Sequence, residues 1–211
     1  MTSKDISRYY DLKAKSSFKA RFDLLLYHRI INGIYGEITK NDLETFEIID
    51  HMDSLNEYIH IFWQQEDIKT YKIRGKTIEN IYQEMKEWQE NNKPNIDRLR
   101  NHYIFNIYNN VFPRIEFDQM VQKANECEYC HITKAQIKTL IEKQKLSKKH
   151  ITRGWSFEID RKAANLEYDI DNCVICCYWC NNAKTDEFSY SEFKKIGAEI
   201  EKIWHERLES K

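Results

Sequence analysis

The chain has 211 residues, of which 41% are hydrophobic and 32% are charged, and its formal net charge is −1. This length and apolar content suffice for one domain or two small ones with a buried core, which excludes disorder along the whole chain. No segment reaches the roughly 18–20 apolar residues that a membrane helix requires. The N-terminus, MTSKDISRYYDLKAK, lacks the apolar region of a secretory signal, so we expect a cytosolic protein without membrane partners.

The near-neutral net charge conceals two segments of opposite sign. Residues 37–67 contain nine Asp and Glu against one Lys, and residues 131–153 contain seven Lys and Arg against one Glu. The acidic segment is interpreted as a solvated helix face or, alternatively, as a docking site for a basic protein partner. The basic segment can hold an anion even though the whole chain is close to neutral.

Only five Gly and two Pro are present, which favours long helices joined by short connections. Asn32-Gly33 is a typical helix stop, Asn41–Glu44 is a plausible capping box, and Thr77 is a plausible N-cap. Apolar side chains at three- and four-residue steps then predict helices over residues 16–32, 42–62, 77–91 and 94–109. The second of these is predicted to be the strongest helix in the chain.

The composition changes after Pro113, where the cysteines and a strand-like pattern begin. We therefore predict an α+β protein with two parts. Residues 1–112 form a helical region for partner, DNA or homodimer contacts, and residues 113–211 form a domain built around cysteines. The helical region contains only single histidines and no cluster of metal-binding residues.

All six cysteines lie after residue 126, and in a reducing compartment such clustering favours metal binding over disulfides. Two C-x-x-C pairs can supply a tetrahedral structural zinc site. We assign Cys127 with Cys130 and Cys177 with Cys180. Cys173-x-x-Cys176 has the same spacing, but residues 172–176 are typical of a strand, whereas residues 178–184 are typical of a turn that enters a helix.

Oxygen-bearing side chains lie on both sides of the second cysteine pair in the sequence. Residues 156–160 alternate as a strand, so Glu158 and Asp160 point to one face and can offer oxygen atoms to a hard cation. Asn181 begins the helix after the second pair and can aim its amide oxygen at the same cation. Two protein oxygens completed by water and phosphate are usual for Mg²⁺ in phosphoryl chemistry, so this pattern indicates a divalent-cation site.

Three elements of the sequence are Phe157-Glu-Ile-Asp-Arg161, Asn172, and Cys177-Tyr-Trp-Cys180-Asn181-x-x-Lys184. Together they resemble the HNH (ββα-metal) endonucleases, and more closely the zinc-bound Asp-Arg branch of that family. The likeness runs from about residue 126 to 204, about two-fifths of the chain. It implies that Asp160 and Asn181 bind a catalytic Mg²⁺ or Mn²⁺ ion, that Asn172 holds the loop between two strands, and that Lys184 contacts phosphate. It also implies a zinc-stabilised DNA endonuclease of bacterial or phage restriction and antiviral defence.

Arg161 stands where HNH proteins usually carry a histidine that acts as general base. A guanidinium cannot accept a proton near neutrality, so Arg161 is expected to clamp the scissile phosphate. In the Asp-Arg branch a tyrosine before the first cysteine pair takes over this role, but its ungapped position here is Gln119. His150 is our first candidate for the base, with His102, Tyr103 and Tyr108 as alternatives; without a base the domain would bind DNA and not cut it.

The basic segment lies between the first cysteine pair and the strand, where it is predicted to follow a nucleic-acid backbone. Its cationic residues are Lys134, Lys138, Lys143, Lys145, Lys148, Lys149 and Arg153. A remaining alternative is an interaction protein whose acidic helix binds a partner that supplies specificity.

Overall fold

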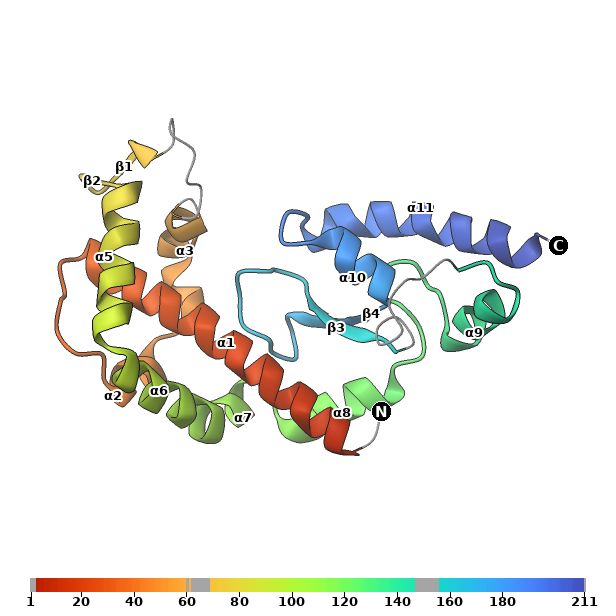
Figure 1. Ribbon diagram of the computed structural model, residues 1–211, viewed down its shortest axis with the longest axis horizontal. Helices are drawn as coiled ribbons and strands as arrows, with labels where there is room; N and C mark the ends of the chain where they lie inside the picture. The colour runs from red at the N-terminus through yellow and green to blue at the C-terminus, as the bar shows by residue number, and fades with distance from the viewer. Residues whose placement is uncertain (1–2, 60, 62–68, 147–155, 211) are drawn as a thin grey trace. The chain divides into compact units, whose positions relative to one another are not determined.

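The computed structural model describes residues 3–59, 61, 69–146 and 156–210. Its helices and two small two-stranded sheets confirm the α+β class (Figure 1). The described residues form two compact units. We call the described parts of Met1–Tyr10, Phe112–Ala164 and Asp169–Lys211 the cysteine unit, and the described parts of Asp11–Val111 with Asn165–Tyr168 the helical unit. None of the described helices combines the length and apolar character needed to cross a membrane.

Helix α1, Ser3–Ile31, begins well before the predicted start at residue 16. The reason is a buried series at four-residue steps, which continues the apolar face backwards and comprises Ile6, Tyr10, Ala14, Phe18 and Phe22. The predicted stop is confirmed, because Gly33 follows the helix with φ at +70°, a conformation that glycine adopts without a Cβ clash.

The long helix predicted over residues 42–62 is wrong. The described chain forms α2 (Lys40–Thr45), the 3₁₀ helix η1 (Ile48–His51) and α3 (Met52–Ile59), and Phe62 lies outside the described residues. Thr39 is the cap: its hydroxyl accepts from the Asp42 N–H, and the Asp42 carboxylate accepts from the Thr39 N–H at 2.7 Å. The backbone becomes extended at Phe46, which lets both Phe46 and Ile48 be buried.

Helix α5, Ile78–Asn91, begins at the predicted cap, where the Thr77 hydroxyl accepts from the Asn80 N–H at 3.2 Å. Strands β1 (Lys72–Ile73) and β2 (Lys76–Thr77) precede it as a hairpin that the sequence analysis did not predict. The helix predicted over residues 94–109 is present in three parts: α6 (Lys93–His102), the π-helix η3 (Tyr103–Ile107) and α7 (Tyr108–Val111).

Basic side chains of the helical unit neutralise part of its acidic segment. The ion pairs are Arg29–Asp42 (3.3 Å), Arg21–Glu47 (3.5 Å) and Arg74–Glu57 (3.6 Å), and His102 Nε2 is hydrogen-bonded to Glu44 at 2.5 Å. These four carboxylates therefore have partners within the unit, and the surface that was considered for a basic protein partner is less charged than the sequence indicates.

A buried ion pair holds the segment Asn165–Tyr168 in the helical unit. The Glu167 carboxylate accepts from Arg21 Nε at 3.0 Å and from Arg21 Nη2 at 2.9 Å, and the Tyr103 hydroxyl also donates to it. Arg21 and Glu167 are only 3% and 7% exposed. Burial raises the pKa of Tyr103, and the charge of Glu167 raises it further, so the hydroxyl stays protonated and remains a donor.

We expect Glu167→Ala to lower the free energy of unfolding by about 3 kcal/mol, because it leaves the Arg21 guanidinium buried without its main counter-charge. Glu47→Ala is the matched control: it removes a half-exposed partner of the same guanidinium and should cost less than about 1 kcal/mol. Equilibrium unfolding in urea measures both variants. Equal losses would show that burial adds nothing to the Glu167 pair.

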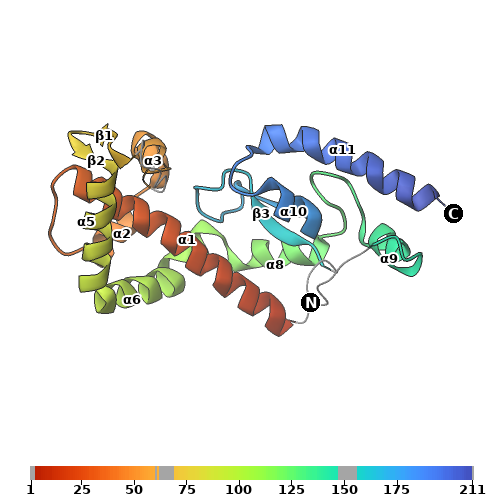
Figure 2. The ribbon, with the colours of Figure 1, turned by 45° about the horizontal axis from the view of Figure 1, so that its top comes forward.

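The cysteine unit places a two-stranded sheet among helices. Strands β3 (Glu158–Arg161) and β4 (Cys173–Cys176) are antiparallel, with Asp160 opposite Val174. Helix α10 (Tyr178–Lys184) packs against β3, as Figure 2 also shows. The remaining helices are α8 (Arg114–Lys123), α9 (Lys134–Glu142) and α11 (Tyr190–Glu209), and α11 packs against α9. Side chains from β4, from α9 to α11 and from Phe157, which precedes β3, share one core with the cysteines.

Candidate functional site

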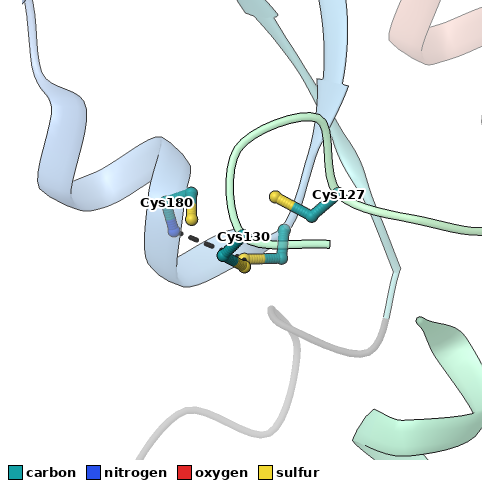
Figure 3. Close-up of side chains that lie close together, drawn as sticks. Cys127, Cys130 and Cys180 are labelled. Carbon is teal, nitrogen blue, oxygen red and sulfur yellow. Dashed lines mark hydrogen bonds between the residues drawn. The ribbon is translucent and has the colours of Figure 1, made fainter. Parts of the chain in front are cut away.

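Four cysteine sulfurs form a buried cluster in which all Sγ atoms lie within 4.8 Å of one another: Cys127, Cys130, Cys177 and Cys180. Cys127 and Cys130 lie on the loop before α9, and Cys180 lies on α10, with their sulfurs turned towards a common centre (Figure 3). The Sγ atoms of Cys130 and Cys177 are 3.7 Å apart. Thiolates bound tetrahedrally to zinc at 2.3 Å are about 3.8 Å apart, so the donor set fits a structural zinc ion.

The structure brings together the four cysteines that the sequence analysis grouped, whereas Cys173 and Cys176 lie on β4. Hydrogen bonds from Cys130 and the other clustered thiols lower the pKa of Cys127. The pKa values of Cys177 and Cys180 are raised. The largest cause for each is the hydrogen bond between its thiol and the Cys127 sulfur. A bound cation would replace these shared protons, as thiolate ligands require.

Backbone hydrogen bonds shape both cysteine turns. In the first turn the Cys127 N–H donates to Ile132 O at 3.1 Å, and the His131 N–H donates to Cys127 O at 3.0 Å. In the second, Cys177 is the N-cap of α10 and its sulfur accepts from the Cys180 N–H at 3.4 Å. The second turn therefore leads directly into the helix that carries Asn181.

Two buried donors hold a single oxygen of the Asp160 carboxylate. The Tyr129 hydroxyl donates to Oδ2 at 2.7 Å, and Lys184 Nζ lies 3.4 Å from the same atom. Burial raises the pKa of Tyr129, and its hydrogen bond to Asp160 raises it further, so the hydroxyl keeps its proton. Because both donors engage Oδ2, Oδ1 is the oxygen that Asp160 can offer to a cation.

The Asn181 amide is oriented by a carboxylate on the facing strand. Asn181 Nδ2 donates to Glu158 Oε2 at 2.5 Å. Glu158 and Asp160 are two residues apart on β3 and so share a face of the strand. Since the amide nitrogen is committed to Glu158, its oxygen is the atom that Asn181 can offer to a cation. The side chains predicted to form the cation site thus lie on β3 and on the helix that packs against it.

Asn172 closes the loop between β3 and β4. Its amide oxygen accepts from the Ala163 N–H at 2.9 Å, and its amide nitrogen donates to Ala163 O at 3.1 Å. The Asn172 carbonyl also accepts from the Lys162 N–H at 2.7 Å. The side-chain amide thereby extends the strand pairing beyond the end of β3.

Lys184 does not lie where a phosphate contact would. Its side chain is 1% exposed, and its Nζ donates to Arg161 O at 2.8 Å in addition to its ion pair with Asp160. The structure therefore makes Lys184 a buried support for Asp160 and for the end of β3. The sequence pattern could not distinguish these two uses of a lysine.

The three alternative candidates for the general base, His102, Tyr103 and Tyr108, do not lie where a general base could reach a substrate. Tyr103 and Tyr108 are fully buried in the helical unit, where neither can reach a substrate. His102 lies in the same unit, and its Nε2 pairs with Glu44. His150 lies outside the described residues, as do Lys148, Lys149 and Arg153, so their roles stay predictions.

Two tyrosines contact the site strand and were not named by the sequence analysis. Tyr129 lies between the cysteines of the first pair, a position that could have drawn notice in the sequence. Tyr9 accepts the Ile159 N–H at 2.7 Å and so satisfies the outer edge of β3. It lies 150 residues before Ile159 and carries no local signal of this contact.

Gly197 allows α11 to lie directly on the first cysteine turn. A Cβ at this position would lie 2.4 Å from the carbonyl oxygen of Tyr129 and 2.7 Å from its carbonyl carbon. Gly→Ala within a helix ordinarily stabilises by about 1 kcal/mol. We expect the opposite sign for Gly197→Ala, a loss of about 1–3 kcal/mol, because the Tyr129 backbone must move. A raised Tm in thermal unfolding of the zinc-loaded protein would contradict this contact.

The site thus consists of an antiparallel hairpin followed by a helix, with Asp160 on the first strand, Asn181 on the helix and the four-cysteine cluster in the same unit. No protein-family model and no curated protein matched the chain. Among solved structures, the chain is similar to the rare-cutting HNH restriction endonuclease PacI, with 28% sequence identity and a TM-score of 0.37. The similar region covers 46% of this chain and 66% of the PacI chain.

Proposed function

We propose that this protein is a metal-dependent DNA endonuclease that hydrolyses phosphodiester bonds with Mg²⁺ or Mn²⁺. The observation that carries the proposal is the support of Asp160, whose Oδ2 is held by two buried donors. Asn181, on the adjoining helix, is oriented in turn by Glu158. Functional side chains fixed by a second layer of contacts are typical of sites that need an exact geometry for a ligand.

Asp160 Oδ1 and the Asn181 oxygen would hold the divalent ion, since hard cations prefer carboxylate and amide oxygens. Such an ion, when bound, would supply positive charge that stabilises the negative charge developing at the phosphorus centre and on the leaving 3′ oxygen. Tyr129 and Lys184 keep the carboxylate in one orientation, and Glu158 does the same for the amide. The four-cysteine cluster holds the turn that positions α10, and we propose zinc as its ion.

The handling of substrate belongs to the same proposal. Arg161 would clamp the scissile phosphate, since a guanidinium can bind two phosphate oxygens at once. His150 would accept the proton of the attacking water. Lys134 and Lys138, both exposed on α9, would follow the DNA backbone. Restriction or defence in a bacterium or phage is the setting that the likeness to HNH enzymes favours.

Incubation of the purified protein with supercoiled plasmid in Mg²⁺, in Mn²⁺ and in EDTA tests the proposal. We expect nicked or linear DNA with either metal and intact plasmid in EDTA. Intact plasmid under every condition, with DNA binding that weakens as salt rises, would identify a catalytically silent binding module instead. Arg161 in place of the usual base is the observation that favours that second candidate.

Tyr129→Phe should lower the rate of cleavage by about tenfold and leave zinc bound, because it removes only the hydroxyl that donates to Asp160. Tyr190→Phe is the matched control. It removes a hydroxyl that donates to Glu128 at 2.5 Å in the same unit but does not contact Asp160, and it should change the rate by less than about twofold. Initial rates of plasmid nicking separate the two variants, and equal losses would refute the positioning role of Tyr129.

A further inference from the structure

The helical unit contains a basic hollow that the proposed chemistry does not use. The hollow has a volume of about 670 Å³ and is lined by side chains of α1, α5 and α6. Its cations come from all three helices and are Lys15, Lys19, Lys86, Lys93 and Arg100, whereas its acidic residues are Asp23, Glu90 and Asp97. Cations from three separate helices therefore converge on one place.

Two of the three carboxylates in the hollow are already engaged. Asp23 is 5% exposed; it pairs with Lys19 and accepts from Gln89 Nε2 at 3.2 Å. Asp97 pairs with Arg100 at 2.9 Å. Among the described residues, no carboxylate lies within ion-pair distance of the three remaining cations, Lys15, Lys86 and Lys93. Only Glu90 remains to offset these three ammonium groups, so the lining, with five cations and three carboxylates, has an excess of two positive charges.

The hollow also has an apolar part, which is lined by Phe18 and Phe22. Phe18 and Phe22 stack with their ring centroids 5.3 Å apart and are 4% and 2% exposed. Trp88 of α5 packs against Phe22 with ring centroids 6.0 Å apart. The helices α1 and α5, which carry Lys15 and Lys86, are thus packed against one another, and an anion bound in the hollow is attracted by the ammonium groups of both.

We infer that this hollow binds the phosphate backbone of duplex DNA, the substrate that the cysteine unit is proposed to cut; the inference rests on that proposed function. A row of phosphates can contact ammonium groups on several helices. Each such contact releases counterions that are condensed on the DNA, a gain in free energy that a single small anion does not provide. The helical unit would then contribute affinity for DNA without taking part in the chemistry.

The test measures binding in the absence of cleavage. The full-length Asp160→Ala protein is titrated, at several salt concentrations, onto a fluorescein-labelled duplex of arbitrary sequence. A triple variant with Lys15→Gln, Lys86→Gln and Lys93→Gln is compared with a control triple variant, Lys72→Gln, Lys123→Gln and Lys195→Gln. Both triple variants carry the same change in net charge, and the control lysines are exposed and lie outside the hollow.

We expect the hollow variant to bind at least about tenfold more weakly and to lower the slope of log affinity against log salt by about 2–3, since each phosphate contact adds about 0.9. The control should lower the slope by less than about 1. Equal losses in the two variants would overturn the inference and leave the endonuclease intact. Competition by millimolar inorganic phosphate as strong as that by unlabelled duplex would also overturn it, in favour of a small-anion site. No binding by the parent protein would refute the proposed function itself.

Discussion

Asp160→Ala will abolish Mg²⁺-dependent cleavage of plasmid, with a loss of at least about 10³-fold in rate, equal to about 4 kcal/mol of transition-state stabilisation. The substitution removes the carboxylate oxygen that we propose for the cation and leaves the four cysteines untouched. Zinc content, measured on the same preparation, should therefore remain that of the unchanged protein. This pairing separates a catalytic metal from a structural one.

Two further variants make this result specific. Asp160→Asn keeps an acceptor for the Tyr129 hydroxyl and so avoids leaving both buried donors without a partner, yet it should lose nearly as much activity because its charge is gone. Asp186→Ala removes an exposed carboxylate in the loop after α10 and should retain activity. Circular dichroism confirms folding. Normal cleavage by folded Asp160→Asn would refute the proposed catalytic role of Asp160.

Cys180→Ser is expected to release zinc and unfold the cysteine unit. Structural zinc sites contribute about 10–16 kcal/mol of binding free energy, as much as or more than the whole stability of a typical domain, about 5–15 kcal/mol. Cys180 is also fully buried in the core that joins β4 to α11, so loss of the site removes the support of that core. Zinc analysis and far-ultraviolet circular dichroism measure the two consequences.

Cys173→Ser is the matched control, because it makes the same change at a buried cysteine of β4 outside the cluster. It should cost a modest amount of stability and keep one zinc per chain. Retention of zinc by Cys180→Ser together with its loss from Cys173→Ser would show that the other C-x-x-C pair holds the ion.

Features with a local cause could be predicted from the sequence. Alternation predicts β3, hydroxyl side chains predict the cap at Thr77, and the contrast between strand-like and turn-like residues around Cys177 selects the four clustered cysteines. The oxygen-bearing side chains of β3 and α10 likewise follow from period-two alternation and from the position of Asn181 after its cysteine turn.

Features decided by tertiary contacts could not be predicted in this way. The apolar period runs unbroken past Phe46, but the chain turns there because Phe46 and Ile48 both become buried. Likewise, the Asn-x-x-Lys pattern does not indicate that Lys184 is buried against Asp160, because this burial depends on the contact of Lys184 with strand β3. The start of α1 is a different case. The apolar series from Ile6 to Phe18 is present in the sequence, so the early start could have been predicted from it.

Each unit includes a short segment from the other end of the sequence: residues 1–10 belong to the cysteine unit and residues 165–168 to the helical unit. This determines which fragments of the protein can fold separately. A fragment that begins at Pro113, the boundary suggested by composition, lacks the Tyr9 hydroxyl that accepts the Ile159 N–H. The complementary fragment ends before Glu167 and leaves Arg21 without the carboxylate that it binds. Neither piece is a self-sufficient module, so this architecture resists transfer of its cutting part alone to another protein by simple gene fusion. A graft would have to carry α1 with it, because that helix supplies both the Tyr9 hydroxyl and the Arg21 guanidinium.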